Sequence, residues 1–265
     1  MTYRTPFVAG NHYPDQQAPL KSQLRVMLRD KNAVSTKPKA IIAPHAGFDH
    51  CGEIAAHAYA AIAPFADQYN QVVVLGPSHR YPVQGCVVPS HDGFITPLGK
   101  IKVNQELCLS LVKSGLAENL DAVHQQEHSI EVQLPFLQHC IGQFTLLPVI
   151  VGKCSPQKLT GLLNQLNEHQ NTLFVVSANL SHFNSKEKAT QLDSNTIKQL
   201  TEFTGDITKE QSCAVSLLNG FSHFVKTNDA KTKNAKCELL RYDNAFNGHQ
   251  VNSEVVGYAS LVYWF

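Results

Sequence analysis

The sequence lacks several patterns that would assign it to a common class of protein. It has no excess of one charge, because 22 Lys and Arg stand against 21 Asp and Glu, whereas nucleic-acid-binding surfaces need a basic excess. It has no apolar run of the roughly 20 residues that a membrane helix requires. Its N-terminus lacks the basic and apolar segments of a secretory signal. We therefore expect a cytoplasmic protein that binds neither nucleic acid nor membrane.

Common catalytic and structural motifs are missing too. The sequence contains neither a P-loop nor the pattern GxGxxG, so no phosphate-binding loop is visible. The segment "GPSHR" (76–80) lacks the closing glycine of a nucleophile elbow. No paired CxxC motifs indicate structural zinc. The seven cysteines are an odd number with irregular spacing, which favours free thiols in a reducing compartment over a disulfide framework.

Short apolar runs alternate with longer amphipathic segments along the whole chain. Apolar strands that are separated by helices predict a sheet covered on both faces. We predict a single α/β domain over residues 1–265, an αβα sandwich whose central sheet is mixed and mainly parallel. The predicted strands are 40–45, 71–79, 84–90, 144–152, 172–183, 236–246 and 253–265, and the predicted helices are 52–65, 104–115, 129–140, 155–169, 187–203 and 209–224.

Three of the predicted buried strands run into a histidine. His45 follows "IIAP", His79 follows "VVVLGPS", and His182 follows "FVVSANLS". In open α/β sheets ligands bind at the carboxyl ends of the strands, so these imidazoles are expected to converge on a metal site or an acid–base site. One strand-terminal histidine is more often structural, but three of them make a functional role the better interpretation.

Two further segments are candidates for the same site. Glu127 and His128 begin the segment "EHSIEVQLPFL", which has helical spacing. Cys213, in "KEQSCAVSLLNGF", lies near the start of a predicted helix and offers a thiolate ligand. The residues alone do not distinguish Cys213 from the other cysteines, which are most simply buried neutral thiols.

Taken together, these motifs resemble the Memo-like family, whose bacterial and archaeal members are called AmmeMemoRadiSam system protein B. The resemblance rests on "IIAPHAGF", "VVVLGPSH", "TPLG", "EHSIEVQLPFL", "LLPVIVG", "SANLSHF" and "VVGYAS", in that order, and covers residues 5–262. It implies the fold of class III extradiol ring-cleaving dioxygenases. Those enzymes hold non-haem Fe(II) with two histidines and a carboxylate.

The resemblance also implies roles for individual residues. His45 and His79 match the family's metal ligands, and Cys213 matches the cysteine that stands where the dioxygenases have their carboxylate. His128 and His182 match residues of the same cleft and are expected to act in acid–base catalysis. The chain departs from the family at Asn179, where an aspartate is usual, and after Cys213, where the usual glycine is an alanine.

Three functions remain open at this point. The first is a metal-dependent oxidoreductase, with Fe²⁺ as the expected metal and copper or zinc as alternatives, because a thiolate makes the ligand set softer. The second is a non-catalytic module that binds a peptide or protein in the cleft. The third is a hydrolase or transferase with Cys213 as nucleophile and His182 as base. The family's name implies a pathway shared with a radical SAM protein and an AMMECR-type protein, and a small molecule or peptide as the cleft's occupant.

Overall fold

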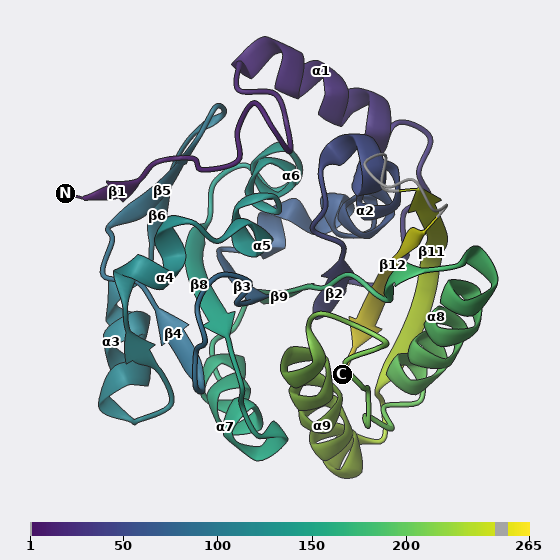
Figure 1. The fold of residues 1–265 in the computed structure, drawn as a ribbon. Coiled ribbons are helices and arrows are strands. Elements are labelled where there is room, and N and C mark those ends of the chain that lie inside the picture. Colours follow the sequence, from purple (N-terminus) through teal and green to yellow (C-terminus); the bar gives the residue numbers. More distant parts are fainter. Residues whose placement is uncertain (1, 247–253) are drawn as a thin grey trace.

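The computed structural model describes residues 2–246 and 254–265 of the chain. These residues form one sheet of 12 strands flanked by helices (Figure 1). The order of neighbouring strands is β1-β5-β6-β8-β3-β9-β2-β12-β10. In addition, β11 pairs with β12, and β4 pairs with both β7 and β8. The antiparallel strands lie mainly toward the two ends of the sheet.

The centre of the sheet consists of parallel strands. Strands β8 (Thr145–Val151), β3 (Gln71–Pro77), β9 (Thr172–Ser177) and β2 (Ala40–Ala43) lie next to one another in that order. They are rich in β-branched and aliphatic residues and are almost completely buried, as expected for strands covered on both faces. Their carboxyl ends therefore lie along one edge of the sheet.

The remaining strands extend this centre to both sides. Next to β2 lies the antiparallel β12, which also pairs with β10 and β11. On the other side, β6 joins β8, and β5 and β1 follow. The bounds of these strands are β1 Tyr3–Arg4, β4 Cys86–Val88, β5 Gly93–Thr96, β6 Gly99–Val103, β7 Glu118–Asn119, β10 His182–Asn184, β11 Lys236–Phe246 and β12 Val255–Trp264.

Helices cover both faces of the sheet. Figure 1 shows α1, α2, α5 and α6 on one side and α7 and α9 on the other, while α8 lies beside β11. The helices are α1 (Gln17–Leu28), α2 (Phe48–Ile62), α3 (Gln105–Lys113), α4 (Asp121–Gln125), α5 (His128–Glu131), α6 (Leu134–Cys140), α7 (Pro156–Asn167), α8 (Lys186–Thr201) and α9 (Val215–Thr232), with a 3-10 helix at Ala63–Gln68. Among the described residues, none of these helices combines the length and apolar character needed to cross a membrane.

The predicted α/β class with a mixed, centrally parallel sheet is confirmed. Several predicted elements differ in extent, three of them in ways that bear on the candidate site. The helix predicted at 129–140 is divided into α5 and α6, because Pro135 lies in the first turn of α6, where its missing N–H does no harm. The strand predicted at 172–183 ends at Ser177, and β10 begins again at His182.

The third difference concerns α9, which begins at Val215 and not at 209, so Cys213 precedes the helix. The predicted last strand begins at Val255, and residue 253 lies outside the described residues, as does His249. Helix α1 and the hairpin of β5 and β6 had no counterpart in the sequence-based interpretation.

Candidate metal centre

Three histidines gather at the carboxyl edge of the central strands. His45 follows β2, His79 follows β3, and His128 opens α5, which packs against β3. The ring centroids lie 5.1 Å apart for His45 and His79, 4.6 Å for His79 and His128, and 5.6 Å for His45 and His128. One nitrogen of each ring lies within 4.8 Å of the others, a spacing that allows one metal ion to be held between them.

His45 is held by the hydroxyl of Ser177, the last residue of β9. The Ser177 Oγ donates to the Ser129 carbonyl at 2.6 Å and accepts from the Gln133 amide at 2.9 Å. Since its one proton is used, it accepts from Nδ1–H of His45 at 3.0 Å. Burial lowers the pKa of His45 well below its usual value. The ring is therefore neutral, with the lone pair on Nε2, which is the form that binds metals.

The side chain of Asn179 binds the backbone of the same histidine. The Oδ1 atom of Asn179 accepts the backbone N–H of His45 at 2.8 Å, and the Asn179 side chain is buried. The carbonyl of Asn179 accepts from the hydroxyl of Ser212, the residue before Cys213. The amide oxygen of Asn179 thus accepts the backbone N–H of His45. Through its two hydrogen bonds, Asn179 connects the segment of His45 with that of Cys213.

His79 is oriented by the buried carboxylate of Glu127. Nδ1 of His79 lies 2.9 Å from Oε1 of Glu127, and the backbone N–H of His79 donates to Oε2 at 2.7 Å. Burial alone would raise the pKa of Glu127, but the hydrogen bonds from His79 and from the backbone of Ser129 lower it to about 2. A carboxylate behind a histidine fixes the ring and raises its basicity as a ligand.

His128 reaches the cluster because α5 lies very close to β3. Gly76 of β3 faces α5, and a methyl group at this position would clash with the Ser129 side chain. The Ser129 hydroxyl also donates to the carbonyl of Pro77 at 2.9 Å. Burial lowers the pKa of His128 to about 4, so this ring too is neutral near pH 7.

Cys213 lies beside the histidines and is exposed. Its Sγ is 3.5 Å from Nε2 of His45, and it also hydrogen-bonds to His79. The sequence-based ligand set of His45, His79 and Cys213 is therefore brought together in space. Among the described residues, however, the group with ligand spacing contains His128 and not Cys213, so His45 and His79 are common to the predicted and the observed sets of three.

His182 lies at the rim of the cluster. It begins β10, and its Nδ1–H donates to the carbonyl of Leu180 at 2.8 Å, which leaves the lone pair on Nε2. Among the described residues, it is not part of the group with ligand spacing. Its electrostatic effect still lowers the pKa of His45, after burial and the other two histidines.

The segment "EHSIE" is anchored from behind by a buried ion pair. Arg4 Nη1 lies 2.7 Å from Glu131 Oε2, and both side chains are fully buried. The other Arg4 nitrogens donate to the carbonyls of His124 and Glu127. Glu131 also accepts from the backbone of Phe7 and Val8 and from the Tyr13 hydroxyl. The N-terminal segment thus holds the chain that carries Glu127 and His128.

Sequence comparisons identify the family to which the chain belongs. A profile of the family described as Memo-like protein matches residues 4–262. The chain belongs to the Memo-like protein family. It is 31% identical to Protein MEMO1 of Danio rerio over 201 residues, which cover 73% of this chain and 67% of that protein.

Two further relatives show how far the similarity extends. Identity to Protein MEMO1 of Mus musculus is 33% over 193 residues, 70% of this chain and 64% of the mouse protein, so the match covers just under two thirds of that relative. A MEMO1 family protein of Methanobrevibacter smithii is 29% identical over 281 residues, 98% of this chain and 99% of the relative.

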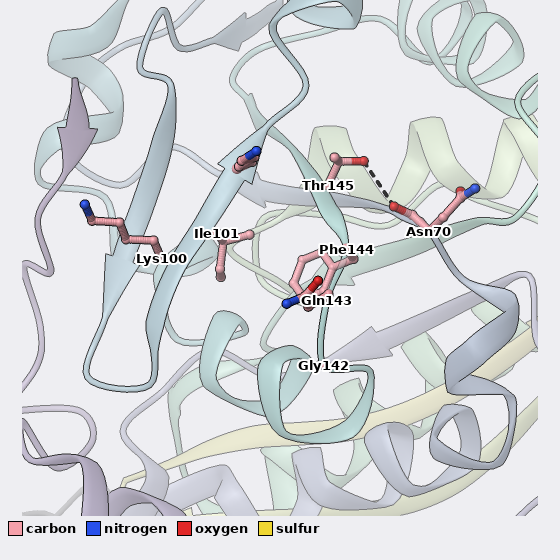
Figure 2. A pocket seen from close by; sticks show the side chains of 8 residues that line it. Asn70, Lys100, Ile101, Gly142, Gln143, Phe144 and Thr145 are labelled. Atoms are coloured by element: carbon pink, nitrogen blue, oxygen red, sulfur yellow. Dashed lines mark hydrogen bonds between the residues drawn. The ribbon is translucent and has the colours of Figure 1, made fainter. Parts of the chain in front are cut away.

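A hollow adjoins the cluster of this Memo-like protein. It has a volume of about 770 Å³ and extends from Cys213 to Cys154, with Lys153 and Lys209 among its lining residues. A second hollow of about 500 Å³, lined by residues such as Lys100, Gln143 and Phe144, is shown in Figure 2. That hollow includes Asn70 and Thr145, at the beginning of β3 and β8, so it lies at the opposite edge of the sheet.

Sequence reasoning missed some supporting residues. His12, in the loop before α1, has its ring 5.2 Å from that of His128, and its Nδ1 has no hydrogen-bond partner within the described part of the chain. The sequence predicts Glu127 as a candidate next to His128, but it does not predict that the Glu127 carboxylate binds Nδ1 of His79. No sequence pattern relates residues 12 and 128, because only the folded chain brings them together.

Metal binding by this protein is expected to depend on pH through His79. Burial would lower the pKa of His79, but Cys213 and Glu127 raise it to about 10. The metal-free ring is thus protonated at pH 7, and the metal must displace that proton. Apparent Zn²⁺ affinity should rise about tenfold per pH unit between pH 6 and 8. Competition titration against a chromogenic chelator at several pH values measures this apparent affinity.

Glu127→Gln is the variant that tests this dependence. Without the carboxylate the pKa of His79 falls, so the affinity should become less dependent on pH and should drop by about 10- to 100-fold at pH 8. Glu106→Gln, an exposed position in α3, is the matched control and should behave like the wild type. Equal pH slopes for wild type and Glu127→Gln would contradict the assignment of Glu127.

Proposed function

We propose that this protein is a metal-dependent oxidoreductase that uses Fe²⁺, with His45 and His79 as two of the ligands and Cys213 or His128 as the third. The observation that carries the proposal is the orientation of the two histidines. Ser177 and Glu127 bind their Nδ1 atoms, so both Nε2 atoms are available beside Cys213 and His128.

The donor set fits a transition metal. Imidazole and thiolate ligands suit iron, zinc and copper, whereas magnesium and calcium prefer oxygen. Within the part of the chain that the structure describes, the carboxylate beside the cluster is that of Glu127, and it is hydrogen-bonded to His79 and to the backbone of Ser129. When bound, iron in such a set supplies a redox-active centre with open coordination positions.

The remaining histidines fit proton transfer. His182 presents an unprotonated Nε2, because its Nδ1–H is bound to Leu180, and can accept a proton from a substrate held in the cleft. His128 is neutral near pH 7 and fits the same role if Cys213 is the third ligand. The volume of the adjoining hollow, about 770 Å³, is typical of small-molecule sites, so we propose a small molecule as substrate.

A second candidate function is supported by the contacts of Cys213. Its sulfur lies against His45 and His79, and a cysteine paired with a histidine is the arrangement of a nucleophilic thiol. Selective alkylation of Cys213 in metal-free protein, with turnover of an activated ester, would favour this function. The hydrogen bonds that Ser177 and Glu127 make to the Nδ1 atoms of His45 and His79 argue for the metal.

The test of the proposed function is elemental analysis of protein purified without chelators and with oxygen excluded. We expect about one iron per chain in the wild type. Loss of iron in Cys213→Ser with retention in His128→Ala assigns Cys213 as third ligand, and the reverse result assigns His128. Absence of metal in the wild type, even after reconstitution with Fe²⁺, would overturn the proposed function.

A further inference from the structure

A second cluster of reactive side chains lies at the far end of the hollow that begins at Cys213. Cys86 opens β4, and Cys154 follows β8 and immediately precedes the N-cap of α7. The two thiols are close enough for each to shift the pKa of the other, and the Cys154 thiol also donates to the Ser155 carbonyl at 3.5 Å. Neither residue belongs to the histidine cluster, and nothing in the proposed function uses them.

The backbone fixes this pair in place. Strand β4 pairs with β8, with Cys86 opposite Val151. Beyond the strands, Gly85 and Lys153 continue the pairing, since the N–H of Gly85 donates to the Lys153 carbonyl at 2.8 Å. Gly152 makes this approach possible, because a methyl group there would clash with the backbone of Val83. The two cysteines are thus held on adjoining segments of the sheet.

The two sulfurs differ in their access to solvent. Cys86 is only 1% exposed, whereas Cys154 is half-buried and lines the hollow. A small oxidant that enters the hollow therefore meets Cys154 first. Cys86 is shielded from solvent and remains in contact with the neighbouring sulfur.

The surroundings of Cys154 favour its thiolate. The hydrogen bond from Cys86 lowers the pKa of Cys154, and so do the charge of Lys158 and a backbone hydrogen bond from Leu159, both in the first turns of α7. Thiols at helix N-termini and beside lysines are commonly activated in this way. Burial raises the pKa of the thiols of Cys51, Cys108, Cys140 and Cys237 to about 12.

We propose that Cys154 and Cys86 are a peroxide-reactive thiol pair, in which Cys154 is oxidised first and Cys86 then closes a disulfide. The Cys154 thiolate attacks one oxygen of hydrogen peroxide. The O–O bond breaks, and hydroxide leaves and takes up a proton, so Cys154 becomes a sulfenic acid and one water forms.

The second step joins the two sulfurs. The sulfur of Cys86 attacks that of Cys154, the S–O bond breaks, and the hydroxide that leaves takes up the thiol proton of Cys86 and becomes water. In sum, two thiols and one peroxide give one disulfide and two waters. The thiols are oxidised and the peroxide is reduced, and no metal takes part.

The test is peptide mapping of the reduced full-length chain after stepwise addition of hydrogen peroxide in the presence of a chelator. Trypsin releases Cys86 in the peptide 81–100 and Cys154 in the peptide 154–158, each with a single cysteine. We expect a disulfide-linked pair of these two peptides under non-reducing conditions, and its loss after reduction. Cys213 lies in a different peptide, 210–226.

Three variants separate the steps. Cys86→Ser should accumulate a dimedone-reactive sulfenic acid on Cys154, and Cys154→Ser should leave Cys86 unmodified. Lys158→Gln should slow the alkylation of Cys154 at pH 7 by about threefold. Cys108→Ser, at a buried thiol in α3, is the control and should form the linked peptide like the wild type.

Two results would overturn the proposal. The first is a linked peptide that joins Cys154 to Cys213 in place of Cys86. The second is oxidation of Cys154 to the sulfinic acid without any linked peptide, because a contacting thiol should intercept the sulfenic acid first. Both results are read from the same digest, and neither depends on metal at the histidine cluster.

Discussion

His79→Ala should lose the metal and keep the fold. The imidazole of His79 belongs to both candidate ligand sets, and its removal leaves two of three donors, so we expect metal affinity to fall by at least about 100-fold. The side chain is 27% exposed, so little packing is lost with it. Isothermal titration with Zn²⁺ measures the affinity, and circular dichroism at increasing temperature measures the fold.

The matched control for this variant is His169→Ala. His169 is exposed and follows α7, at the opposite edge of the sheet from the cluster. It should bind metal like the wild type. His45→Ala should reproduce the loss seen in His79→Ala. Unchanged metal content in either cluster variant would rule out the assigned site.

Glu131→Ala should cause the largest loss of stability. The variant leaves the fully buried Arg4 guanidinium without its carboxylate, and it also removes the acceptor of Phe7, Val8 and Tyr13. Breaking a buried pair by removal of one partner costs about 3–5 kcal/mol. Urea unfolding followed by fluorescence of Trp264 measures the change in the free energy of unfolding.

Glu53→Ala provides a control of the same chemistry at the surface. Glu53 forms an ion pair with Lys31 at 2.7 Å, the distance of the buried pair, but its side chain is 62% exposed. Its removal should cost less than about 1 kcal/mol. Equal destabilisation by the two variants would show that burial of the Arg4 pair contributes nothing.

Much of the central sheet could be predicted from the sequence because its strands are apolar on both faces. Runs such as residues 71–77 and 145–151 carry almost no polar residue, and they are bounded by polar segments. The hairpin of β5 and β6 was not readable, since its strands are short and β6 is largely exposed. Its pairing depends on contacts with β1 and β8, which are distant in sequence.

The sequence predicted the histidines of the site but not the residues that hydrogen-bond to them. His45 and His79 closely follow the ends of β2 and β3, and such strand ends can be recognised from the apolar runs before them, whereas His182 begins β10 after residues 178–181. The sequence did not predict which residues bind the Nδ1 atoms of His45 and His79. Ser177 and Glu127 are distant from these histidines in the sequence, and only the fold brings them within hydrogen-bonding distance. Asn179 shows the limit most clearly, since the sequence identified it as a departure from the family and the structure places it behind His45.

The order of the strands has a consequence for synthesis of the chain. Strand β12 comes after every candidate ligand in the sequence, yet it pairs with β2, which leads to His45, and with β10, which contains His182. Such long-range pairing forms late, since the loops that it closes are large. On a ribosome the ligand-bearing strands emerge well before their last neighbour. We therefore expect metal loading to follow the pairing of β12 with β2 and β10.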